Sequence, residues 1–304
     1  MLLGIHHRTT YLYHRPVSLG PHRLMLRPRE SPTLRLLSFA VETAPPSLVS
    51  WSDDVYGNAI ATAMPLWAAD CLTIDSHVRV DILAGPPPQL AGRAGRYPFR
   101  YTDSEWNDLG PLARPQHQDP QGELQAWAQA FVAAHPTDTL SLLRDLNAGI
   151  ADWVFYQSRD AEGTQTPMET LRRGWGSCRD LAVLLAEAVR WLGFGARLVS
   201  GYVYLPGLDL PRPDQAGQAA AGPAPGSTHA WVEIYLPGAG WVAFDPTNRS
   251  YGSDNLVPVA VARDITQLPP VDGSFTGATA DYIGMHVGVE VTALQGQMQP
   301  GGWS

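Results

Sequence analysis

The sequence predicts an α+β fold, in which an N-terminal antiparallel β-sandwich-like domain precedes a core made of a central helix packed on an antiparallel sheet. Three observations predict this arrangement. Residues 1–83 consist of short β-rich stretches, residues 124–192 carry apolar residues at helical spacing, and three more strand-like stretches occupy residues 196–245. A block of helices therefore lies between two blocks of strands, which is typical of an α+β protein.

The N-terminal region is expected to form a small antiparallel sandwich. Its main strand candidates lie at residues 9–13, 23–28, 35–41 and 72–80, and clusters of proline and glycine separate them. The run Tyr-Gly-Asn-Ala at residues 56–59 joins two further strand-like stretches. This run therefore indicates a hairpin turn.

Residues 84–121 are rich in proline and glycine and predict a connector with little regular structure. The domain boundary is expected inside this segment. We therefore predict four parts: a β-rich domain at residues 1–95, a connector at 96–121, a core at 122–295 and a polar tail at 296–304.

Helical periodicity begins near residue 124 and predicts helices over residues 124–132 and 140–156, followed by a short helix that proline opens at position 167. The next helix is the central one. Ser177 is a favourable N-cap and Asp180, three residues later, completes a near capping box, so we expect this helix to begin at Cys178. Free N–H groups and the helix dipole at that position favour a thiolate.

Three strands are expected after the central helix, at residues 196–205, 228–236 and 240–245. A tight connection makes the last two a hairpin, so His229 and Asp245 are expected at the same open end. Residues 207–226 between the first two strands predict a long loop, either a mobile flap or unstructured. Cys178 as nucleophile, His229 as base and Asp245 as the residue that orients the imidazole would form a thiol-dependent catalytic triad.

Each of these residues also has an ordinary structural interpretation. Cysteine is often a small buried core residue, a strand histidine is often a satisfied core residue, and an aspartate before proline often forms a turn. The three residues together, in this order and on these elements, favour the catalytic interpretation.

Three segments resemble the motifs of the transglutaminase-like (papain-like thiol) superfamily, most closely those of its bacterial members. They read Gly-Trp-Gly-Ser-Cys-Arg-Asp-Leu-Ala at residues 174–182, His-Ala-Trp-Val-Glu at 229–233 and Trp-Val-Ala-Phe-Asp-Pro-Thr-Asn at 241–248. The first eighty residues, with Asp-Val-Tyr-Gly-Asn at 54–58, resemble the β-rich N-terminal region that accompanies this core in bacterial proteins.

The resemblance implies a thioester acyl-enzyme formed on Cys178 from an amide, with His229 as base and acid and Asp245 as orienting residue. The backbone N–H of Cys178 is a candidate oxyanion donor. The family takes a second donor from an upstream aromatic or polar side chain, for which Tyr156 and Trp175 are the candidates.

The net charge of −8 and the absence of a basic patch in the sequence argue against nucleic-acid and anionic-membrane partners. Two cysteines are too few for a disulfide framework, and the N-terminal residues contain no signal-peptide pattern. We therefore expect a cytoplasmic protein. The resemblance implies a peptide or amide substrate. Its oligomeric state stays open.

No metal site or cofactor is expected. The spacings among four N-terminal histidines match no ligand motif, and alternation along a strand separates neighbouring histidines onto opposite faces: His6, His7, His14 and His22. Asp264 and Asp272 are too sparse for a calcium loop of the kind that animal cross-linking members of the family use.

Three functions follow as hypotheses. The first is a cysteine-dependent amide hydrolase, either a peptidase or an amidase, in which water resolves the thioester. The second is an acyltransferase that joins glutamine side chains to amines. The third is a non-catalytic binding module, which would have no need of all three triad residues.

Overall fold

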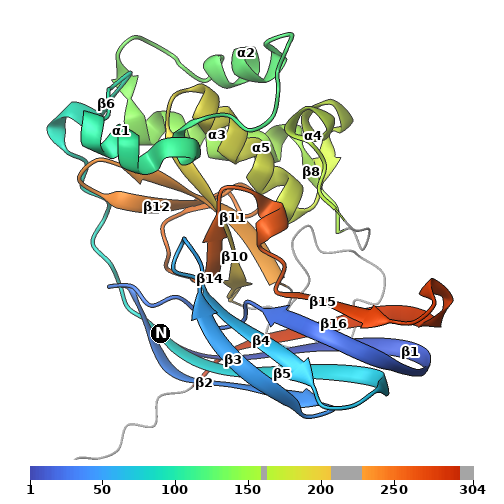
Figure 1. The fold of residues 1–304 in the computed structure, drawn as a ribbon. Helices are drawn as coiled ribbons and strands as arrows, with labels where there is room; N and C mark the ends of the chain where they lie inside the picture. Colours follow the sequence, from blue (N-terminus) through green and yellow to red (C-terminus); the bar gives the residue numbers. More distant parts are fainter. Residues whose placement is uncertain (159–162, 207–227, 295–304) are drawn as a thin grey trace, which may run out of the picture.

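The computed structural model describes residues 1–158, 163–206 and 228–294. It confirms the predicted α+β fold (Figure 1): helices cover one side of a five-stranded sheet, and a curled N-terminal sheet lies at its other side. The loop predicted at residues 207–226 and the tail at 296–304 fall outside the described residues. Within those residues, no helix is long and apolar enough to span a membrane.

The N-terminal sheet is antiparallel and has the strand order β2-β5-β1-β4-β3, with two further strands paired to β1. The predicted hairpin turn lies between β3 and β4, which pair from Asp53↔Ala59 onward. The strands of this sheet are β1 (Leu2–Leu24), β2 (Leu34–Ala44), β3 (Ser47–Asp53), β4 (Ala59–Pro65), β5 (Ala69–Ile82), β15 (Val271–Thr276) and β16 (Tyr282–Ala293).

Strand β1 organises this sheet and differs from the sequence prediction of two separate strands. It runs through Pro16, and its pairing with β5 shifts register between Leu12 and Val17. A proline has no N–H to donate, so an irregularity in the ladder is its expected place. One long strand thus replaces the two strands that the sequence suggests.

The C-terminal strands also differ from the prediction, which assigns residues up to 295 to the core. Strand β16 pairs with β1 over Leu3–Tyr13, on the side opposite β5. Strand β15 pairs with β1 over Ser18–Leu24, where β4 pairs with the other side of β1. The edge of a strand as long as β1 presents a row of unpaired N–H and C=O groups, which these strands satisfy. The chain therefore returns to its N-terminal sheet after completing the core.

The core consists of the sheet β13-β12-β11-β10-β14, covered by helices that surround α5. Its strands are β10 (Gly195–Val203), β11 (Thr228–Leu236), β12 (Gly240–Asp245), β13 (Ser250–Tyr251) and β14 (Leu256–Ala262). The helices are α1 (Asp103–Leu109), α2 (Glu123–Gln129), α3 (Thr139–Trp153), α4 (Pro167–Arg173) and α5 (Cys178–Trp191). Two short ladders join β6 (Arg96–Tyr97) to β7 (Thr137–Asp138) and β8 (Phe155–Tyr156) to β9 (Trp175–Gly176).

Helix α1 lies inside the connector that was expected to have little regular structure. Thr102 accepts from the N–H of Glu105, and the Glu105 carboxylate accepts from the N–H of Thr102, which completes a capping box. The flanking prolines and glycines conceal this seven-residue helix in a composition-based prediction.

The two sheets are joined by buried polar contacts. The Asn58 side chain makes two 2.8 Å hydrogen bonds to the backbone of Val261 on β14. Nδ1 of His7 on β1 is hydrogen-bonded to the Tyr202 hydroxyl of β10 at 3.0 Å. Burial is the main cause that lowers the pKa of His7 to about 4. A neutral histidine therefore lies at the junction, and the N-terminal sheet is part of the same packed structure as the core.

Candidate active site

The start of helix α5 is held by a network around Asp180. The Asp180 Oδ2 atom accepts from the N–H of Ser177 at 2.8 Å and from its hydroxyl at 2.9 Å, while Oδ1 accepts from the N–H of Gln165 at 2.7 Å. A Cβ on Gly176 would lie 2.8 Å from the Cβ of Asp180, so glycine is required for this approach. Cys178 is thereby fixed as the first residue of the helix, half-buried and not in a disulfide.

Strands β11 and β12 bring His229 and Asp245 together at their open end, as the sequence predicts. The Nε2 atom of His229 lies 2.7 Å from Oδ2 of Asp245, and both side chains are 0% exposed. The His229 ring stacks on the buried Trp231 ring, with centroids 6.0 Å apart. Opposite His229 stands Gly201, where a Cβ would lie 2.8 Å from the Trp231 ring, so this close packing also requires glycine.

The Asp245 carboxylate is positioned by the turn that follows β12. Its Oδ1 accepts from the N–H groups of Thr247 at 3.0 Å and Asn248 at 3.3 Å, and its Oδ2 accepts from Nδ2 of Asn248 at 2.7 Å. The Nδ2 atom of Asn147 on α3 holds the backbone of this turn through the carbonyl of Ser250 at 3.1 Å. These hydrogen bonds therefore orient the Asp245 carboxylate toward His229.

The electrostatics of this pair follow from its burial. Burial by itself would lower the pKa of His229, but the charge and hydrogen bond of Asp245 and the nearby Cys178 thiol raise it to about 10. Burial likewise opposes ionisation of Asp245, yet His229 and Asn248 hold the pKa of its carboxyl below the usual value. The His229 ring therefore carries a proton at neutral pH beside a carboxylate.

The remaining ring nitrogen of His229 is the one available to Cys178. Nδ1 is buried and makes no hydrogen bond among the described residues, while Nε2 is committed to Asp245. The Cys178 thiol is one of the groups that interact with this ring. The geometry thus supplies a sulfur atom, an imidazole and a carboxylate in sequence.

The two candidate oxyanion residues have different surroundings. Tyr156 on β8 pairs with Gly176 on β9, two residues before Cys178. Burial, and then the charge of Cys178, raise the pKa of the Tyr156 hydroxyl. The ring of Trp175 instead lies under the guanidinium of Arg173, 5.7 Å from the ring centroid. Tyr156 is therefore the better placed of the two, and its role as oxyanion donor stays a prediction.

The sequence predicts no role for Asn248 or Gln165, although both contact the network described above. Asn248 belongs to the segment that resembles a family motif, and a short polar residue three positions after a turn aspartate is a signal for such a contact. Gln165 precedes the N-cap of α4 and is nearly fully buried, which its polar sequence context does not indicate.

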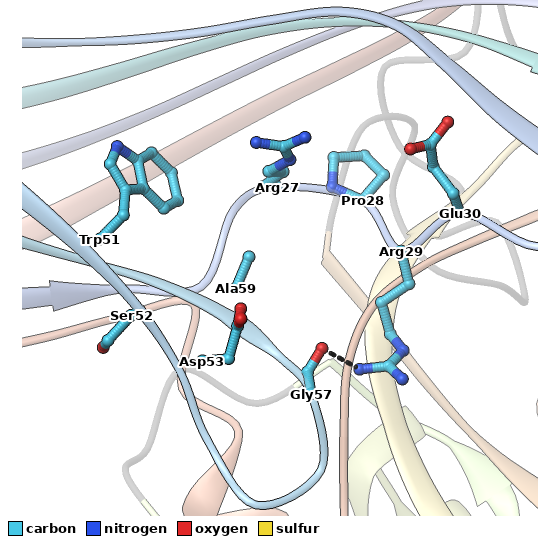
Figure 2. Close-up of a pocket in the computed structure, with 9 residues that line it drawn as sticks. All are labelled: Arg27, Pro28, Arg29, Glu30, Trp51, Ser52, Asp53, Gly57 and Ala59. Carbon is cyan, nitrogen blue, oxygen red and sulfur yellow. Dashed lines mark hydrogen bonds between the residues drawn. The ribbon is translucent and has the colours of Figure 1, made fainter.

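A cavity of about 440 Å³ opens in the N-terminal region beside the β3–β4 hairpin (Figure 2). Its Arg29 guanidinium donates to the carbonyl of Gly57 at 2.9 Å and to Oδ1 of Asn58 at 2.7 Å. Since Asn58 also binds the backbone of Val261, Arg29 supports the junction of the two sheets. The cavity is lined by Arg27, Pro28, Arg29, Glu30, Trp51, Ser52, Asp53, Gly57 and Ala59.

Comparison with known families gives two matches along this chain. Residues 3–81 match the bacterial transglutaminase-like N-terminal region, and residues 125–246 match the transglutaminase-like superfamily. The second match contains all three proposed triad residues, and the first covers β1 to β5 of the N-terminal sheet.

Comparison with individual proteins gives relatives of nearly full length. An uncharacterized protein of Mycobacterium tuberculosis is 28% identical over 95% of this chain and 92% of its own, and one of Mycobacterium leprae is 25% identical over 95% and 97%. A candidate cysteine protease of Cytophaga hutchinsonii has the same fold, with a TM-score of 0.72 and 20% identity over 100% of this chain and 94% of its own.

Proposed function

Since this chain belongs to the transglutaminase-like superfamily, we propose that it is a cysteine-dependent amide hydrolase, a peptidase or an amidase, that works through Cys178, His229 and Asp245. The observation that carries the proposal is the fully buried His229–Asp245 pair, whose remaining ring nitrogen is available to the Cys178 thiol. The description of the structural neighbour as a candidate cysteine protease supports it.

The reaction begins from a thiolate–imidazolium pair of Cys178 and His229, which the raised pKa of His229 favours. The sulfur attacks the amide carbonyl carbon and forms a tetrahedral intermediate. His229 then gives its proton to the leaving nitrogen, the C–N bond breaks, and an amine or ammonia departs from a thioester. Water attacks the thioester while His229 takes its proton, which releases the acid and restores Cys178.

Asp245 orients His229 and stabilises its protonated form throughout this cycle. The oxyanion is assigned to the Cys178 backbone N–H and to the Tyr156 hydroxyl. A tyrosine hydroxyl is protonated at neutral pH, and burial raises the pKa of Tyr156 further, so the hydroxyl is a hydrogen-bond donor there. The proposed substrate is a peptide or a small amide, and the steps require no cofactor.

The test is a screen of peptides and small amides by mass spectrometry, with a fluorescent amine present as competing acceptor. We expect an acid product that is lost in Cys178→Ala and retained in Cys71→Ala, with little amine incorporated. Incorporation of the amine that depends on Cys178 would instead make the protein an acyltransferase. Turnover that survives Cys178→Ala would overturn the proposed role of Cys178. A complete absence of turnover and of acylated Cys178 would overturn the proposal in favour of a binding module.

A further inference from the structure

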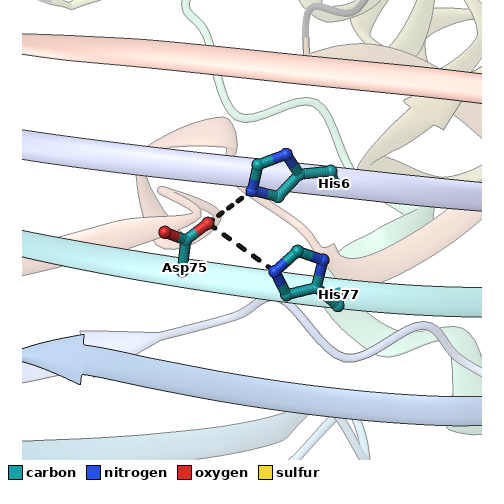
Figure 3. A group of neighbouring side chains, drawn as sticks. All are labelled: His6, Asp75 and His77. Atoms are coloured by element: carbon teal, nitrogen blue, oxygen red, sulfur yellow. Dashed lines mark hydrogen bonds and ion pairs between the residues drawn. The ribbon is translucent and has the colours of Figure 1, made fainter.

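A second cluster of chemically reactive side chains lies on the N-terminal sheet, outside the proposed catalytic site. Antiparallel pairing puts His6 of β1 directly opposite His77 of β5. Asp75 precedes His77 by two residues, so its side chain is on the same face of the strand. Figure 3 shows the two imidazoles and the carboxylate pointing toward one another.

The donor atoms of these three residues converge. One ligand atom from each lies within 4.8 Å of the other two. Nε2 of His6 is 2.5 Å from Oδ1 of Asp75, and Nε2 of His77 is 3.9 Å from the same oxygen. The two imidazole rings are parallel, 6° apart in plane and 4.4 Å between centroids. Donors around a tetrahedral zinc ion are separated by about 3.4 Å, so small side-chain rotations complete such a site.

The two carboxylate oxygens of Asp75 have different partners. Arg8, directly opposite Asp75 in the ladder, donates through Nε to Oδ2 at 2.7 Å. This contact fixes the carboxylate and directs Oδ1 toward the two histidines, in the manner of the outer hydrogen bonds that orient metal ligands. Because the charges of Arg8 and Asp75 cancel and neutral imidazoles carry none, a bound divalent cation would give the site a net charge of about +2.

The scaffold under the cluster is rigid and its outer side is accessible. His6 lies in β1, which pairs with β5 on one side and with β16 on the other, where Glu290 stands opposite His6. His77 and Glu290 are exposed. His7, the next residue of β1, is buried on the other face against Tyr202, so the cluster points away from the core.

We propose that His6, Asp75 and His77 form a binding site for a divalent transition-metal ion of the zinc class. Two imidazole nitrogens and one carboxylate oxygen are the donors that such ions prefer, and water or Glu290 completes the coordination. The bound ion joins β1 to β5 and stabilises the N-terminal sheet, because it binds only the folded arrangement. This site is independent of the proposed amide hydrolysis.

The test uses the full chain without any histidine tag and with the substitution Cys178→Ala. This substitution removes the thiol of the proposed catalytic site, which could otherwise bind the metal together with His229. After chelation and dialysis, Zn²⁺ is titrated by calorimetry and by thermal unfolding. We expect one ion bound per chain and a melting temperature raised by several degrees. His77→Ala, at an exposed position, weakens zinc binding by at least about tenfold.

The matched control is His14→Ala, since His14 is an exposed histidine of the same strand outside the cluster. It is expected to bind zinc as the parent chain does. Co²⁺ is expected to give only the weak visible bands of nitrogen and oxygen ligation. No binding by the metal-free chain, an equal loss in His14→Ala, or a strong thiolate charge-transfer band from Cys71 would overturn the proposal.

Discussion

Two histidine–aspartate pairs in this molecule have similar separations and opposite surroundings. His229 and Asp245 are 2.7 Å apart with both side chains 0% exposed, whereas His6 and Asp75 are 2.5 Å apart with 33% and 13% exposed. The first pair is closed in by Trp231 and by the turn after β12. The second lies on the outer face of a sheet, where Arg8 shares the carboxylate.

The two pairs consist of the same residue types, so the difference in their proposed roles follows from burial. Away from water, the interaction between an imidazolium and a carboxylate is poorly screened, and it holds the His229 pKa near 10. At the surface, solvent and ions screen the same interaction and the pair contributes little to stability. The buried pair is thus suited to proton transfer, and the partly exposed pair is open to a ligand.

The largest expected effect is that of Asp245→Asn on the proposed hydrolysis. The change removes the charge that orients and stabilises protonated His229, so turnover is expected to fall by about 10³- to 10⁴-fold. Steady-state rates on the best amide from the screen measure this loss. Asp75→Asn is the matched control and leaves turnover within about twofold, because that carboxylate is far from the chemistry. An equal loss of turnover in Asp245→Asn and Asp75→Asn would contradict the claim that only the buried pair takes part in catalysis.

The second effect is on stability as a function of pH. The pKa of His229 is raised on folding, so its contribution to the free energy of unfolding is fully present below the ordinary value of 6.5 and is lost as pH rises toward about 10. Urea unfolding of the native chain and of His229→Gln, from pH 6 to 10, measures it. The difference in free energy of unfolding between the native chain and His229→Gln is expected to be several kcal/mol at pH 6 and to become smaller as the pH rises. A difference that does not depend on pH would contradict the buried ion pair.

A smaller effect is expected for Asn248, which donates to the Asp245 carboxylate. Asn248→Ala removes one hydrogen bond to a charged group, so turnover is expected to fall by about 10- to 100-fold while the fold is retained. The control is Asn255→Ala, whose side chain donates to the carbonyl of Tyr204 away from the triad. If Asn248→Ala left turnover unchanged, Asp245 would not depend on the Asn248 side chain for its orientation.

The smallest effect is that of His6→Ala in metal-free protein. His6 and Asp75 are only partly buried and lie on the solvent side of the sheet, and an ion pair at a protein surface contributes about 0.2–1 kcal/mol. The free energy of unfolding is therefore expected to change by about 1 kcal/mol or less. Urea unfolding at neutral pH, in the presence of a chelator, measures the change. A loss of several kcal/mol would show that the His6–Asp75 pair is as important to the fold as the buried His229–Asp245 pair.

The sequence predicts well those features of the site that depend on local chemistry. Ser177 and Asp180 mark the start of α5 because a cap needs only neighbouring residues, and the short turn before Gly240 implies that His229 and Asp245 meet. The order of the three proposed triad residues also matches a family motif, which local patterns alone would not connect.

Features that depend on distant pairing could not be predicted in this way. The histidines of the N-terminal region match no ligand spacing, yet strand register places His6 opposite His77, about seventy residues along the chain. The same limit conceals the pairing of β15 and β16 with β1, since a strand pattern does not state which edge it completes. Helix α1 is hidden for a different reason, because proline and glycine around it dilute its signal.

The most direct test of the proposed catalytic centre is the alkylation of the two cysteines by iodoacetamide at neutral pH, followed by mass spectrometry. Cys71 is the internal control, since both thiols are free and half-buried and differ in whether a histidine–aspartate pair adjoins them. We expect Cys178 to react about a hundredfold faster than Cys71, and the advantage to disappear in His229→Ala. Equal, slow labelling of both cysteines in the native chain would contradict the activation of Cys178.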